Sequence, residues 1–130
     1  MSSIFTKIIN GEIPAHKVYE DDQILAFLDI NPSSKGHTLV IPKVEIDHFD
    51  DLPDAVYQRL MMVSKRIAKQ IKAKYSPMRV GMMIFGTEVP HAHVHLIPLY
   101  TGQEMAFVRE STGEPDHKKL AEVAKDLEIS

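Results

Sequence analysis

One segment of this chain reads His91-Ala92-His93-Val94-His95-Leu96, with a histidine at every second position and an apolar residue after each one. In an extended chain, successive side chains point to opposite faces. The three imidazoles therefore share one face, and Ala92, Val94 and Leu96 share the other. The pattern predicts a strand with one face in the core and one face that carries chemistry.

Two other interpretations of the three histidines remain open. They could lie on the solvated face of an edge strand, or they could bind a metal. Zinc lies roughly 2.0–2.1 Å from its nitrogen ligands, whereas His91 and His95 are about 13 Å apart on a straight strand that rises roughly 3.3 Å per residue. One strand therefore cannot easily bring all three onto one ion, although His93 and His95 could bind one together with a distant ligand. Our first expectation is that the protein has no metal site and requires no cofactor.

Composition limits the class of protein. The chain has 130 residues, no cysteine and a net charge of −3. This length fits one domain with its own core, and the negative charge argues against non-specific nucleic-acid binding. The sequence lacks a long uncharged apolar run and a signal-like N-terminus. We therefore expect a cytoplasmic protein with neither nucleic acid nor membrane as a partner.

Apolar spacing and turn residues predict the secondary structure. The longest expected element is a helix from Pro53 to about Tyr75, in which apolar residues recur every three or four positions. The other expected elements are a helix over residues 4–9 capped by Ser3, strands over 17–20, 24–30, 37–41, 79–85 (buried) and 91–96, and a helix over roughly 115–128. Short-looped strands with flanking helices indicate an α+β domain with a largely antiparallel sheet.

The histidine face suits chemistry at phosphorus. An imidazole with a pKa of about 6.5 is mostly neutral in the cell, so its ring nitrogen can act as a nucleophile without a separate base. Attack on an α-phosphate forms a phosphoramidate, which water cleaves in a second step. Flanking imidazoles, ~6.6 Å away along the strand, can bind phosphate oxygens and supply a proton to the leaving group. The middle residue, His93, is the natural nucleophile.

The histidine segment, continued by Ile97, resembles the signature of the histidine triad (HIT) family of nucleotide hydrolases and transferases. Residues 4–14, 26–32 and 36–43 also resemble that family in order and spacing. The resemblance implies a single HIT domain over residues 1–130, with a core at about 4–98 and a C-terminal extension at about 99–130. It also implies a five-stranded antiparallel sheet with one long and one or two short helices, and a homodimer that joins two sheets into a larger one.

The resemblance also implies roles for polar residues. His93 would carry the nucleotide, and His95 would contact the phosphate and assist the leaving group. His91 and His37 would complete a relay that orients His93. Asp29 would hold the ribose hydroxyls, which its two acceptor oxygens suit, although it could instead only cap the turn that follows it.

Four apolar residues match the family's cleft around the base, although plain core packing is the alternative for each of them. They are Phe5, Ile8, Phe27 and Ile30.

The loop before the histidines departs from the family's better-known branches. Residues 85–90 are shorter than the corresponding family segment, and the Asn and Gln that clamp ribose and phosphate there are missing. Thr87 and the main chain of Glu88 and Val89 are the expected substitutes in nucleotide binding. Glu88 would repel a polyanion unless it points away.

These observations together imply a hydrolase that cleaves at the α-phosphate of a purine nucleotide derivative and releases the nucleoside monophosphate. The derivative could be a nucleoside phosphoramidate, an adenylate or a dinucleoside polyphosphate. Having His95 rather than Gln at the third position resembles the hydrolase branches. Two alternatives are a catalytically weak nucleotide-binding regulatory module and a metal-dependent hydrolase or metal-binding protein.

Overall fold

A five-stranded antiparallel sheet forms the centre of the computed structural model, which describes residues 2–107 and 114–129. The spatial order of the strands is β1-β2-β3-β5-β4. Their bounds are β1 Lys17–Glu20, β2 Ile24–Leu28, β3 Thr38–Pro42, β4 Arg79–Met83 and β5 Val94–Leu99. The helices are α1 Ile4–Ile9, α2 Asp54–Tyr75 and α3 His117–Leu127, with 3-10 turns at Phe49–Asp51 and Glu104–Phe107. The predicted α+β fold is confirmed.

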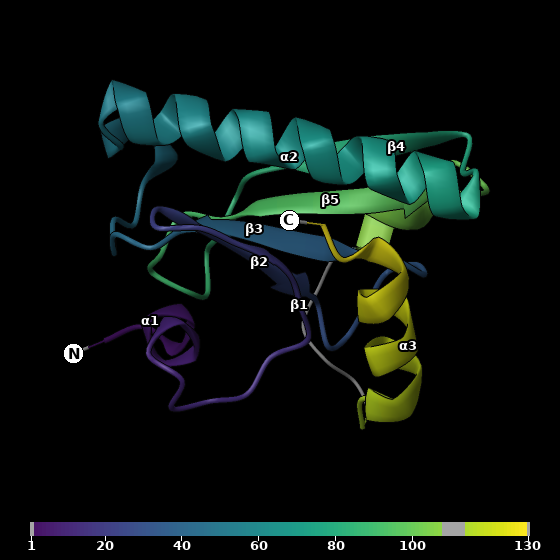
Figure 1. Ribbon diagram of the computed structural model, residues 1–130. Helices are drawn as coiled ribbons and strands as arrows, with labels where there is room; N and C mark the ends of the chain where they lie inside the picture. Colours follow the sequence, from purple (N-terminus) through teal and green to yellow (C-terminus); the bar gives the residue numbers. More distant parts are fainter. Residues whose placement is uncertain (1, 108–113, 130) are drawn as a thin grey trace.

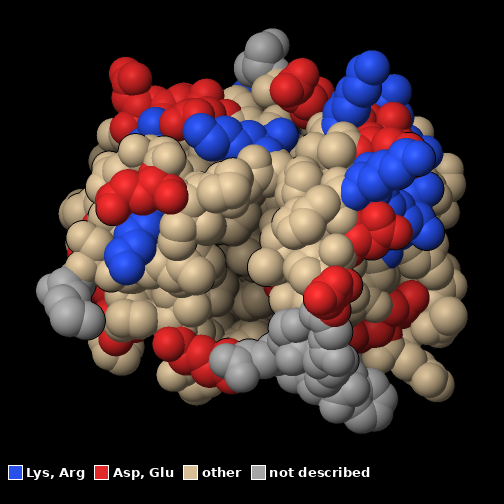
Figure 2. All heavy atoms as spheres, turned by 90° about the horizontal axis from the view of Figure 1, so that it is seen from below, with Lys and Arg blue, Asp and Glu red and all other residues tan. Residues whose placement is uncertain are grey.

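The sheet buries apolar residues on both faces. The long helix α2 lies along one face, and the short α1 lies against the other (Figure 1). Helix α3 packs on α2, β1 and β2, and its apolar residues join the larger core cluster. Viewed from the side of α1 and α3, the molecule has a hollow between these two helices (Figure 2). No helix in the described part of the chain is long and apolar enough to cross a membrane.

The predicted helices are confirmed to within two residues at each end. Ser3 caps α1, because its hydroxyl accepts the N–H of Thr6. Helix α2 begins after Pro53 and ends at Tyr75, where Ser76 adopts a left-handed conformation with φ 49°. Side-chain spacing and capping residues are local signals, so the sequence defines these bounds well.

Strand β4 differs from the prediction of a buried strand over residues 79–85. It ends at Met83 and lies at the edge of the sheet, where Met82 is 45% exposed. An apolar run does not distinguish a central strand from an edge strand, because that depends on pairing with distant segments.

The histidine strand also begins later than predicted. Strand β5 starts at Val94, because the N–H of His91 bonds to Val89 and that of Ala92 bonds to Ile46 in place of a regular ladder. The predicted alternation nevertheless holds, since Ala92, Val94 and Leu96 are buried in the core beneath α2. Strand β2 ends at Leu28, whereas its apolar run had predicted an end at Ile30.

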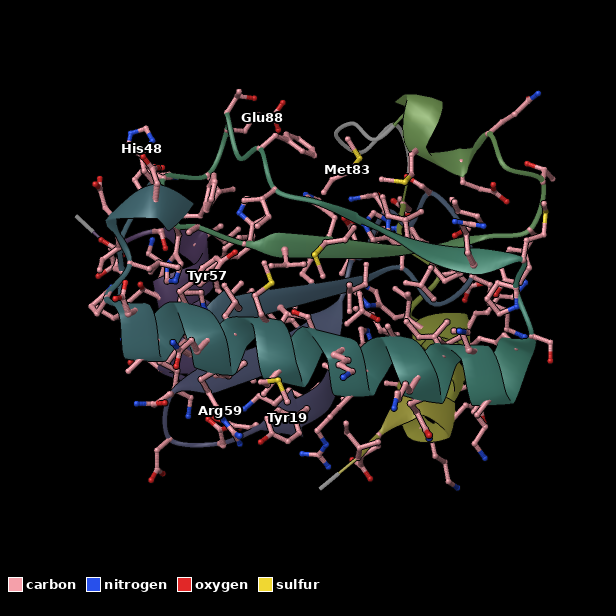
Figure 3. The ribbon with its side chains drawn as sticks, turned by 90° about the horizontal axis from the view of Figure 1, so that it is seen from above. Tyr19, His48, Tyr57, Arg59, Met83 and Glu88 are labelled. Carbon is pink, nitrogen blue, oxygen red and sulfur yellow. The ribbon has the colours of Figure 1, made fainter. Side chains whose placement is uncertain are left out.

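A polar cluster ties α2 to the hairpin of β1 and β2. Arg59 donates from Nε and Nη2 to Asp21 Oδ2 at 3.0 and 2.7 Å, and the Tyr19 hydroxyl donates to the same oxygen at 2.7 Å. Figure 3 shows Tyr19 and Arg59 side by side along α2. Burial alone would raise the pKa of Asp21, but these bonds and two main-chain amides hold it well below its usual range. The ionised carboxylate therefore stabilises the fold.

We expect Asp21→Asn to lower the free energy of unfolding at pH 7 by about 1–3 kcal/mol, since it removes charge-assisted hydrogen bonds. A depressed folded-state pKa contributes stability that is present above the unfolded-state pKa of about 3.9 and is lost as pH falls through the folded-state value. The difference from wild type should therefore shrink below about pH 4. Urea unfolding across pH measures it, with the exposed neighbour Asp22→Asn as control. An equal loss in both variants would contradict the assignment.

Candidate functional site

A cleft of about 470 Å³ lies between α1, the end of β2, the loop before β5 and the histidines themselves. All eight residues predicted to bind nucleotide line it. They are Phe5, Ile8, Phe27, Asp29, Ile30, Thr87, Glu88 and Val89. His93 and His95 line it as well. The structure therefore brings together segments that are far apart in the sequence.

The apolar wall of the cleft serves two purposes. Phe5, Ile8 and Phe27 are almost fully buried and pack together between α1 and the sheet, as the core-packing interpretation requires. They also line the cleft. Ile30 is 44% exposed and lies outside that core cluster. The wall is thus packed into the core near α1 and exposed to solvent at Ile30.

The cleft is poor in positive charge. Among the described residues that line it, none is lysine or arginine, and the charged ones are Asp29 and Glu88. Figure 3 places Glu88 at the outer tip of its loop. A highly charged polyphosphate would find little Coulombic attraction among these side chains. An anion in this cleft would meet imidazoles, a hydroxyl and main-chain amides in place of cationic side chains.

His93 has one ring nitrogen bound to the main chain. Its Nδ1 lies 2.7 Å from the carbonyl oxygen of His91. A carbonyl can only accept, so Nδ1 carries the proton and Nε2 keeps its lone pair. Burial lowers the pKa of His93, although the bond to His91 opposes part of that shift. His93 is therefore neutral at pH 7, with an unprotonated nitrogen available as nucleophile.

His91 anchors α1 with its imidazole. Its Nε2 donates to the carbonyl of Pro42 at 2.7 Å, so its Nδ1 accepts the Ser3 hydroxyl at 2.9 Å. Glu45 Oε1 accepts the N–H of Ser3 and the hydroxyl of Thr6, both at 2.6 Å. This network holds the N-terminus of α1, and with it Phe5, against the histidines. His91 thus orients His93 through its carbonyl, while its side chain positions the cleft wall.

His37 contacts His95 instead of His93. His37 Nε2 lies 3.0 Å from His95 Nδ1, and His37 Nδ1 accepts the main-chain N–H of Ser33 at 3.0 Å. His37 thus reaches His93 only through His95, whose ring centroid lies 5.0 Å from that of His93, and its part in a relay stays a prediction. Burial, and then the neighbouring histidine, lower the pKa of His37 to about 3 and that of His95 to about 4.

Asp29 caps the turn after β2 and also faces the cleft, while its predicted contact with ribose stays a prediction. Its Oδ1 accepts the N–H of Asn31 at 2.8 Å and so stabilises the turn after β2. Its Oδ2 lies 3.6 Å from His37 Nε2, and the side chain lines the cleft. Burial raises the pKa of Asp29 despite the bond from Asn31. Capping the turn fixes the carboxylate at the cleft without using its second oxygen.

Two residues of the shortened loop were not predicted as site residues. The Phe85 ring stacks on His95, with ring centroids 4.8 Å apart and an interplanar angle of 5°. Gly86 has φ +64°, and a Cβ there would lie 3.1 Å from His93 Cε1. The short loop therefore supports both histidines by close packing. A glycine beside an aromatic residue before the histidines was the available sequence signal.

The polar cluster beside His95 resembles a metal site in spacing. One ligand atom from each of Asp29, His37 and His95 lies within 4.8 Å of the others. However, a metal-bound histidine almost always donates its other ring N–H, whereas His37 Nδ1 accepts one from Ser33. These residues therefore do not fit a metal at His37 Nε2. Within residues 2–107 and 114–129, no third histidine or carboxylate joins His93 and His95 as a metal-binding group.

Comparison with known proteins defines the family. The family model of the HIT domain matches residues 10–102, and this chain belongs to the HIT family. A HIT-like protein of Methanocaldococcus jannaschii, itself uncharacterized, is 42% identical over 128 residues, which cover 95% of this chain and 97% of the relative.

Two further matches bear on activity and fold. The adenosine 5′-monophosphoramidase HNT1 of Saccharomyces cerevisiae is 38% identical over 125 residues, covering 95% of this chain and 79% of the yeast protein. The crystal structure of a HIT-like protein from Bartonella henselae superimposes with a TM-score of 0.85 at 33% identity, covering 97% and 93% of the two chains. The matches support a nucleotide hydrolase and confirm the fold.

We predict that Gly86→Ala displaces His93, because its Cβ would press on the ring and its positive φ disfavours a side chain. Gly102→Ala is a matched control, since Gly102 has φ +90° and a Cβ added there would meet no heavy atom within 4 Å. The left-handed backbone should cost each variant roughly 1–2 kcal/mol of stability. In NMR spectra, only Gly86→Ala should shift the ring resonances of His93. Unchanged resonances in that variant would contradict the packing role.

Proposed function

We propose that this protein hydrolyses purine nucleoside phosphoramidates to the nucleoside monophosphate and an amine. The observation that carries the proposal is the neutral His93, whose Nδ1–H bonds to a carbonyl and whose Nε2 is free to attack. The apolar wall suits a purine base, and Asp29 supplies an acceptor for ribose hydroxyls. The yeast relative's name supports the same substrate class.

The proposed reaction has two steps. His93 Nε2 attacks the α-phosphorus and a P–N bond to His93 forms. The leaving nitrogen takes up a proton from solvent, its bond to phosphorus breaks and a neutral amine departs. The ring then carries a positive charge, which its Nδ1–H shares with the carbonyl of His91. Water attacks the same phosphorus in the second step and returns a proton to solvent, which releases the monophosphate and regenerates neutral His93. No step uses a metal.

The electrostatics of the cleft favour a phosphoramidate over a dinucleoside polyphosphate. A phosphoramidate brings about one or two negative charges, whereas a polyphosphate chain brings more to a site whose described lining holds two carboxylates and neither lysine nor arginine. We rank the phosphoramidate above the polyphosphate because of unfavourable Coulomb energy, not because of the shape of the cleft. The hydrolase interpretation thus gains a preferred substrate class.

Release of AMP from adenosine 5′-phosphoramidate, assayed in EDTA, tests this function. Wild type should release AMP faster than it does from a diadenosine polyphosphate. His93→Ala should lose at least about 10³-fold in kcat, as for other enzymes that lose a covalent nucleophile, yet still bind AMP. Bound AMP without turnover in wild type would favour the regulatory-module alternative. Loss of activity in EDTA would favour the metal-dependent one.

We also propose a homodimer that joins two sheets at β4. This strand is the edge whose Met82 is 45% exposed. The opposite edge, β1, has charged ends at Lys17 and Glu20, and its Val18 carbonyl accepts the N–H of Ile129. Pairing at β4 would bury its exposed apolar side chain and continue the sheet.

For the dimer, we expect Met82→Lys to convert a two-chain particle into a monomer in light-scattering chromatography, because the charge would be buried at the interface. Val44→Lys is the control, since Val44 has a matching exposure of 44% in the loop after β3. A monomeric wild type, or a Met82→Lys variant that stays dimeric, would refute pairing at β4.

A further inference from the structure

The loop between β2 and β3 delivers a main-chain amide to the buried histidines. The N–H of Ser33 points at His37 Nδ1, 3.0 Å away. A main-chain amide can only donate, so Nδ1 must be the unprotonated nitrogen of the ring. Neutral His37 therefore carries its proton on Nε2.

That choice of tautomer passes to the next ring. His37 Nε2 and His95 Nδ1 are 3.0 Å apart, so one proton lies between them. Because it belongs to His37 Nε2, His95 Nδ1 accepts it, and neutral His95 must carry its own proton on Nε2. His95 Nε2 is buried and has no hydrogen-bond partner among the described residues. In the series of hydrogen bonds from Ser33 through His37 to His95, this N–H is the group that remains available to a ligand.

The loop that carries the Ser33 amide is anchored on both sides. The Ser34 hydroxyl donates to the carbonyl of Pro98 at 2.7 Å, and the Ser34 carbonyl accepts the N–H of His37 at 3.1 Å. The Tyr100 hydroxyl donates to the carbonyl of Lys35 at 2.9 Å. These contacts with the end of β5 hold the amide in place relative to His95.

We propose that the Ser33 amide is a positioning group that keeps His95 neutral with its proton on Nε2, so that His95 donates a hydrogen bond to a phosphate oxygen. A doubly protonated His95 would turn an Nδ1–H toward the N–H on His37 Nε2. The repulsion between these two N–H groups would end only if the His37 proton moved to Nδ1, where it would face the Ser33 N–H instead. The other titratable groups around this pair are His93 and Asp29.

This assignment rests on the proposed function and gives the N–H of His95 a role in the transition state. The leaving nitrogen takes its proton from solvent, so that the electron pair of the broken bond stays on nitrogen and a neutral amine departs. Phosphate oxygens gain charge in the transition state, where the N–H of His95 stabilises them.

Nitrogen-15 NMR of labelled histidines in the free protein, at neutral pH, tests the tautomers directly. In wild type, His37 and His95 should each show a protonated Nε2 and an unprotonated Nδ1. Replacing the Ser33 amide by an ester removes the N–H and keeps the side chain, and both rings should then populate mixed tautomers. Ser33→Ala keeps the amide and should match wild type. The ester should also lower kcat by about tenfold, which is the lower end of the loss when metal-bound imidazoles lose such an outer hydrogen bond.

A protonated His37 Nδ1 in wild type would overturn the proposal, and so would wild-type tautomers in a folded ester variant. An ester variant that fails to fold leaves the wild-type and Ser33→Ala spectra as the deciding measurements. The spectra need no substrate. An inactive wild type with the stated tautomers would therefore refute the hydrolase but keep the positioning role, whereas an active one with other tautomers would do the reverse.

Discussion

Three buried imidazoles each have one ring nitrogen held by a main-chain group. His91 Nε2 donates to Pro42, His93 Nδ1 donates to His91, and His37 Nδ1 accepts from Ser33. Main-chain groups have a fixed donor or acceptor character, so each bond selects a tautomer as well as an orientation. Burial lowers the pKa values of all three rings and keeps them neutral. The chemistry of the cleft depends on these contacts.

The fold brings these main-chain groups together from separate segments. Strand β3 pairs with β5 and places His37 beside His95, while the end of β3 offers the Pro42 carbonyl to His91. Helix α1 is then attached to His91 through Ser3. The sheet therefore positions the histidine rings, and the same hydrogen bonds position the apolar wall that would hold the base.

Local patterns in the sequence predicted much of this arrangement. The alternation over residues 91–96 identified the chemical face and the core face, and the apolar spacing between Pro53 and Tyr75 identified α2. The predicted nucleotide residues all line one cleft, although their roles stay predictions. These features follow from side-chain periodicity or from a resemblance over short blocks.

Features that depend on distant partners could not be predicted in this way. Edge and central strands share the same apolar run, so the exposure of β4 was missed. The partner of His37 follows from strand register, and the Ser33 amide carries no side-chain signal at all. Phe85 was missed because stacking on His95 depends on the path of the short loop.

The central claim is that His93 forms a covalent bond to the nucleotide. Wild-type protein mixed with adenosine 5′-phosphoramidate, quenched in alkali because such P–N bonds are labile in acid, should show an added AMP group by intact-protein mass spectrometry. Fragmentation should locate that group on His93. AMP released during turnover without any adduct on rapid quenching, or an adduct on another residue, would contradict the account.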